Sequence, residues 1–65
     1  MWTTYWFEIT DEDSDLAGEE FLTELKTDDK NEHISYAKSI FPDVKLRCLG
    51  RVSEYEAESM GLDTY

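Results

Sequence analysis

The chain has 65 residues, of which 16 are acidic and six basic, giving a net charge of −10 at neutral pH. A chain of this length forms at most one domain, residues 1–65, and a domain of this size rarely encloses a ligand-sized pocket. Its single cysteine, Cys48, excludes an internal disulfide and a cysteine-based zinc cage, which favours a reducing, cytoplasmic setting.

The acidic residues are concentrated in two parts of the chain. Residues 1–25 hold eight acids and no base, and residues 52–65 hold four acids and no base. All six bases lie within residues 26–51, together with the other four acids. We therefore expect the folded protein to have an acidic side and a nearly neutral side.

The N-terminal third predicts a long hairpin. Residues 2–9 are nearly all aromatic or β-branched, which favours a strand with Tyr5, Phe7 and Ile9 on one face. Residues 10–18 include four acids, so we expect a loop that charge repulsion keeps extended. Alternation resumes over residues 20–26, which predicts a second strand antiparallel to the first. We find neither a signal peptide at the N-terminus nor an apolar run long enough to cross a membrane.

The middle of the chain changes period. Apolar residues recur at three- and four-residue steps from position 34 to 41, which predicts a helix over residues 30–41. Asp28 or Asp29 supplies the N-cap, with Glu32 in a capping-box position after Asp29. Pro42 ends the helix, because the residue before a proline is disfavoured in the α conformation.

The last third predicts a strand and a short helix. Residues 44–52 alternate between apolar residues and mainly basic ones, which indicates a third strand. Ser53 and Glu56 form a second capping box for a helix that runs to Met60, with Gly61 as its C-cap.

The expected fold is α+β: a small three-stranded antiparallel sheet with two helices on one face, in the order ββαβα. The residues expected in its core are apolar or aromatic and face the helices: Tyr5, Phe7, Ile9, Phe21, Leu25, Ile34, Ala37, Ile40, Phe41, Val44, Leu46, Cys48, Val52 and Met60.

No group of residues predicts catalysis, a metal site or a cofactor. Asp11, Asp13 and Asp15 alternate like the first ligands of a calcium-binding EF-hand loop, but the glycine and the final glutamate of that loop are missing. His33 has no nucleophile placed beside it, and the strand pattern turns Cys48 inward, where a thiol is usually unreactive.

Two surfaces are candidates for binding a partner. The first is an acidic shell made by the predicted loop and the last helix: Asp11, Asp13, Asp15, Glu19, Glu20, Glu54 and Glu58. The second is the sheet face opposite the helices, where aromatic, aliphatic and basic residues are expected together: Trp2, Trp6, Leu22, Arg47, Leu49 and Arg51. Trp and Arg are enriched in interface hot spots.

These surfaces give two functional hypotheses. In the first, the chain is a small cytoplasmic inhibitor, of the phage or mobile-element type, whose carboxylates mimic nucleic acid and bind a basic protein surface. In the second, it is a structural subunit that docks or forms a homodimer through the Trp2/Trp6 face. Direct binding of nucleic acid is disfavoured, because a charge of −10 repels phosphate.

Overall fold

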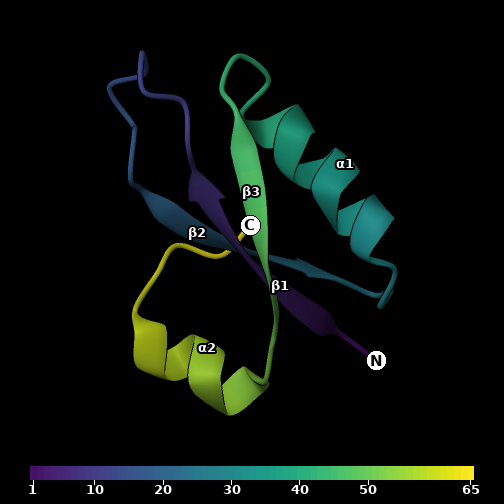
Figure 1. The fold of residues 1–65 in the computed structure, drawn as a ribbon. Coiled ribbons are helices and arrows are strands. Elements are labelled where there is room, and N and C mark those ends of the chain that lie inside the picture. The colour runs from purple at the N-terminus through teal and green to yellow at the C-terminus, as the bar shows by residue number, and fades with distance from the viewer.

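The computed structural model of the protein describes all 65 residues and contains a three-stranded sheet and two helices (Figure 1). β1 is central and pairs antiparallel with β2 on one side and β3 on the other. The antiparallel sheet, the two helices and their order confirm the prediction. Neither helix is long and apolar enough to cross a membrane. The elements are β1 (Thr3–Ile9), β2 (Glu20–Leu25), α1 (Lys30–Ile40), β3 (Leu46–Val52) and α2 (Glu54–Met60).

The loop between β1 and β2 folds into turns, so the prediction of an extended loop was wrong. The Asp11 carboxylate accepts a hydrogen bond from the Asp13 N–H at 3.1 Å, and the Asp11 carbonyl accepts one from the Ser14 N–H at 3.1 Å. The Gly18 N–H then donates to the Ile9 carbonyl at 2.9 Å, which returns the chain to β1. Local hydrogen bonds of this kind are typical of Asp and Ser, and here they prevail over charge repulsion.

The main core lies between the sheet and α1. Tyr5, Phe7, Ile9, Phe21 and Ala37 form one buried cluster, as predicted. The rings of Phe7 and Phe21, register partners on β1 and β2, stack with centroids 5.5 Å apart. Predicted core residues at the edge of this cluster are partly buried against it: Ile34, Phe41, Val44, Leu46 and Cys48.

The N-terminus predicted for each helix from its capping residue is present. Asp29 is the N-cap of α1 and accepts a hydrogen bond from the Asn31 N–H at 2.9 Å. The capping box of Ser53 and Glu56 opens α2, and Gly61 is its C-cap. These local signals fix where each helix begins, because they satisfy N–H groups that have no partner within the helix.

A β-bulge in β3 overturns part of the predicted strand pattern. Cys48 is the register partner of Phe7 but Gly50 is the partner of Trp6, so Leu49 has no partner on β1. Gly50 has φ +124°, a backbone conformation that favours glycine. The extra residue reverses the alternation, so Val52 pairs with Thr4 and lies on the face away from α1. Val52 is buried as predicted, but outside the main core cluster.

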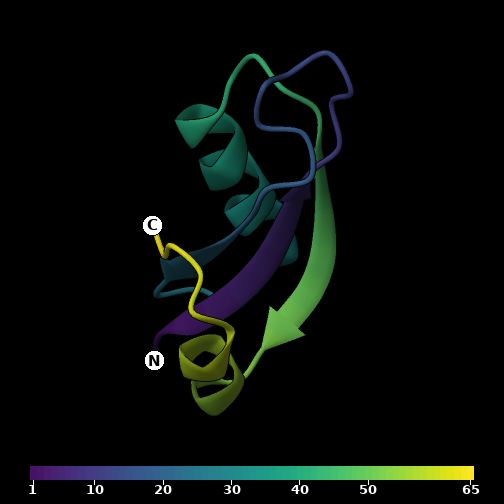
Figure 2. The ribbon, with the colours of Figure 1, turned by 90° about the vertical axis from the view of Figure 1, so that its left-hand side faces the viewer.

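The two helices lie on opposite faces of the sheet, which corrects the prediction that they share one. Figure 2 shows α2 and the C-terminal tail in front of the sheet and α1 behind it. α2 lies beside the start of β1, where Ala57 and Glu58 line a hollow together with Thr4 and Glu24. α2 has no buried residue, so its position depends on the segments at its two ends.

Candidate functional site

The fold joins the two segments that contain no basic residue. The C-terminal tail runs parallel to the outer edge of β2, where Leu22 and Thr64 form a bridge (Figure 2). The Leu22 N–H donates to the Asp63 carbonyl, the Tyr65 N–H to the Leu22 carbonyl and the Glu24 N–H to the Tyr65 carbonyl, each at 2.9 Å. Twelve of the 16 acids therefore belong to two adjacent segments, residues 1–25 and 52–65. We call their carboxylates the acidic surface.

The acidic surface is long rather than compact. Asp11, Asp13, Asp15 and Glu19 lie in the loop at one end of the molecule, whereas Glu54 and Glu58 lie on α2 at the other end (Figures 1 and 2). The longest dimension of the molecule is 35 Å. The predicted acidic residues thus form two end groups, and Glu20 and Glu24 on β2 lie between them.

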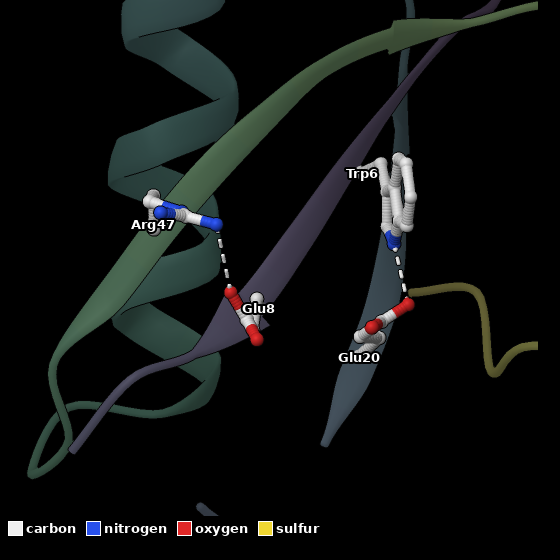
Figure 3. A network of polar contacts seen from close by, with 4 residues as sticks. All are labelled: Trp6, Glu8, Glu20 and Arg47. Carbon is white, nitrogen blue, oxygen red and sulfur yellow. Dashed lines mark hydrogen bonds and ion pairs between the residues drawn. The ribbon is translucent and has the colours of Figure 1, made fainter. Parts of the chain in front are cut away.

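Two carboxylates near the loop end are held close to each other across neighbouring strands. Glu8 and Glu20 are register partners on β1 and β2, and like charges in this arrangement are destabilising. Figure 3 shows how each finds a donor. Arg47 forms an ion pair with Glu8 at 3.2 Å, and the Trp6 indole N–H donates to Glu20 at 3.0 Å. Arg47 and Trp6 therefore serve the local charge balance of the acidic surface.

The second predicted surface is only partly present. Leu22 is completely buried, so its assignment to an exposed face was wrong; the tail is bonded to its backbone at the edge of β2, and α2 lies on this face of the sheet (Figure 2). Trp6 and Leu49 are half-buried. Arg51 pairs with Tyr5 because of the bulge, so its strand position belongs to the other face, although Arg51 still lines a hollow with Trp2 at the end of the sheet.

Trp2 is the aromatic residue of this predicted surface that stays open, with 58% of its area exposed. The Lys26 ammonium group lies 5.2 Å from the centroid of its ring, a cation–π contact within the protein.

The two residues considered for catalysis, His33 and Cys48, lie in the core or against it. His33 is fully buried on α1, although the sequence analysis placed no core role on it. Cys48 is half-buried against the core, as predicted. No group of three or more His, Cys, Asp or Glu side chains is arranged to hold a metal ion, so the three alternating aspartates of the loop do not converge.

A depression beside Thr4 is not indicated by the sequence. One hollow of about 720 Å³ and a second of about 280 Å³ share Thr4, Glu24 and Glu54 as lining residues. We call the two together the Thr4 depression. The predicted antiparallel pairing of the first two strands indicated that Thr4 could lie beside Glu24. Nothing in the sequence indicated that α2 lies next to these two residues.

We compared the chain with models of known protein families, with curated proteins and with solved structures, and none of the three comparisons gave a match.

Proposed function

We propose that this protein is a small cytoplasmic binding protein that presents carboxylates to a basic surface of a partner protein and inhibits that partner by occupying a site for nucleic acid. The observation that carries the proposal is the joining of the two base-free segments by the tail on β2. It concentrates twelve carboxylates on adjacent segments, while all six bases belong to the remaining part of the chain. A charge distribution of this kind steers a protein toward basic surfaces.

The average charge density supports the nucleic-acid part of the proposal. Divided over the 35 Å length of the molecule, the twelve carboxylates give on average about one charge per 3 Å, similar to the roughly 3.4 Å per phosphate along one strand of DNA. Arg47 neutralises only Glu8 among them, since this is the only ion pair within 4.0 Å in the protein. A basic groove that binds DNA would release its counterions in a similar way on binding this surface.

The structure gives less support to docking through the Trp2/Trp6 face. That hypothesis needs an open apolar surface, but Leu22 is buried and Trp6 is half-buried with its N–H bonded to Glu20. Trp2 alone offers little apolar area compared with the roughly 800 Å² per partner of a standard interface. The acidic surface is therefore the stronger candidate.

Charge reversal at the two ends of the acidic surface tests the proposal. In the variant Asp13→Lys, Asp15→Lys, Glu58→Lys, three exposed carboxylates become ammonium groups, and none of the three side chains makes an internal ion pair. We expect a partner captured by the natural protein at low salt to be lost, because the attraction between the two surfaces is reversed. The captured partner should also dissociate when salt or duplex DNA is added.

The matched control reverses three acids on the nearly neutral side, with the substitutions Asp28→Lys, Glu32→Lys and Asp43→Lys. The net charge changes equally, so binding through the acidic surface should be weakened far less by this control. Equal losses in the two variants, or a complex that resists both high salt and duplex DNA, would contradict the proposal.

A further inference from the structure

The Thr4 depression combines an aromatic ring, carboxylates and a hydroxyl at the α2 end of the sheet. Its larger hollow is lined by Trp2, Glu24 and Glu54, among others, and its smaller hollow adds Glu58. Arg51 is the only basic residue among those that line it. Arg51 has no carboxylate within 4.0 Å, so these glutamates are not paired within the protein.

The Thr4 side chain provides the second, independent observation. Thr4 is 93% buried, with only 7% of its area exposed, and its hydroxyl makes no hydrogen bond within the protein. Every side-chain nitrogen or oxygen atom that is fully shielded from solvent has a hydrogen-bond partner. Because the Thr4 hydroxyl has no partner, it must open to the hollows that Thr4 lines. A nearly buried hydroxyl without a partner leaves hydrogen-bonding capacity for a bound group.

The fold positions these groups through three neighbouring strands and α2. Thr4 on β1 has Glu24 as its register partner on β2 and Val52 as its partner on β3. Ser53 follows Val52 directly and caps α2, which places Glu54 in the first turn of the helix and Glu58 one turn later. The bulge at Leu49 contributes, because it turns Val52 toward this face.

The spread of the acceptors identifies the chemistry of the ligand. The carboxylates share the depression but are not arranged to hold a metal ion. A planar guanidinium group has five N–H donors, which reach several separate acceptors, and it stacks on a tryptophan ring more readily than an ammonium group does. We propose that the Thr4 depression binds the side chain of an arginine on the surface of the partner protein. This inference rests on the proposed function for the identity of the partner.

A peptide titration tests the inference without the partner. The probe is acetyl-Gly-Arg-Gly-amide, and its lysine counterpart is the comparison; the readout is the amide NMR spectrum of the full chain. We expect the arginine peptide to shift the signals of Thr4, Glu24 and Glu54 and to bind more tightly than the lysine peptide. Equal affinities for the two peptides, or shifts centred on the acidic loop, would overturn the inference.

Three variants sharpen the measurement. Glu24→Gln with Glu54→Gln should weaken arginine-peptide binding about tenfold, because two carboxylate acceptors become uncharged amides and their ionic attraction to the guanidinium group is lost. Thr4→Val keeps the side-chain volume and should weaken binding of the arginine peptide about threefold, in line with the loss of one hydrogen bond to a hydroxyl oxygen. Arg51→Gln removes the basic side chain from the lining of the larger hollow, which leaves the N-terminal ammonium group of Met1 as its remaining cation, and should tighten binding.

The matched control is Asp13→Asn with Asp15→Asn, which removes the same charge at the far end of the molecule. It should change the affinity less than twofold by ordinary screening. An effect equal to that of the glutamate pair would mean diffuse attraction and overturn the inference. Peptide binding at Thr4 without any salt-sensitive partner would contradict the proposed function alone. Salt-sensitive partner binding without peptide binding would overturn the arginine site alone.

Discussion

His33 is fixed at both ring nitrogens and by its ring face. Nε2 lies 2.8 Å from the Thr27 carbonyl, which only accepts hydrogen bonds, so Nε2 carries a hydrogen. In the neutral ring, Nδ1 then accepts a hydrogen bond from the Thr23 hydroxyl at 2.7 Å. The Tyr5 ring lies 4.4 Å from the imidazole centroid. This buried polar contact joins α1 to β2 and β1.

Substitutions at Thr23 measure what this contact contributes to stability. Thr23→Val keeps the volume of the fully buried side chain but removes the hydroxyl, which leaves Nδ1 without a donor. We expect a loss of about 2 kcal/mol in the free energy of unfolding, measured by urea denaturation. Adding His33→Phe to Thr23→Val should recover part of the loss, since removing both polar partners costs less than removing one. Thr23→Ser is the control because it keeps the hydroxyl, and a larger loss in Thr23→Ser than in Thr23→Val would contradict this role.

The residues that the sequence misplaced share a physical cause. Hydrophobic alternation correctly placed Tyr5, Phe7 and Ile9 in the core, because β1 is a regular central strand. It put Leu22 on an open face, since alternation gives the side on which a residue lies but not what covers that side. His33 was missed for a related reason: a polar residue becomes a core residue only when tertiary partners satisfy it.

At the scale of the elements, local signals predicted well and long-range placement did not. Capping residues gave the start of both helices, because the hydrogen bonds that they satisfy lie within four residues. The bulge at Leu49 could not be predicted, because the sequence alternates regularly through this position. The position of α2 depends on the pairing of the tail with the edge of β2, a contact of long sequence separation that no local pattern specifies.

Tyr65 holds the tail against β2 and so positions α2. Its ring makes edge contacts with Phe21 and Phe41, with centroids 5.8 and 5.7 Å apart. Contacts of this kind contribute about 0.5–1.5 kcal/mol each. We expect Tyr65→Ala to release the tail and to accelerate hydrogen exchange of the Leu22 and Glu24 amides, which donate to it, roughly tenfold.

The amides of α1 report whether this release is local. Exchange in the first half of α1 should stay unchanged in Tyr65→Ala, because the aromatic contact of Tyr65 with this helix is at the C-cap, Phe41. Tyr55→Ala removes a ring that is 80% exposed on α2 and should leave the exchange of Leu22 and Glu24 as it is. Equal acceleration throughout the chain would show that Tyr65 stabilises the whole fold rather than the tail.

For the whole molecule, the three charge blocks of the sequence lead us to expect an acidic and a nearly neutral side, but they do not give the shape of the acidic side. The blocks lie along the chain, and the fold decides how they meet. The tail on β2 unites the first and last blocks, and the 35 Å length of the molecule separates their ends. The loop and α2 therefore carry separate groups of predicted binding residues (Figure 1).

This concentration of like charge must lower the stability of the folded state at low ionic strength. Eleven carboxylates of the acidic surface have no ion pair within 4.0 Å, and their repulsion acts over distances that about 0.15 M salt screens to roughly 8 Å. We therefore expect the melting temperature to rise with sodium chloride, by about 4–8 °C for each kcal/mol of repulsion removed.

The variant Asp13→Asn, Asp15→Asn, Glu58→Gln separates repulsion from general salt effects. It removes three exposed charges without breaking an ion pair or a side-chain hydrogen bond of the protein, so it should melt at a higher temperature than the natural chain at low salt. Its melting temperature should also depend less steeply on salt, because less repulsion is left to screen. If both chains instead gained equally from salt, the gain would come from stronger apolar burial, and the acidic surface would already be balanced by contacts nearby.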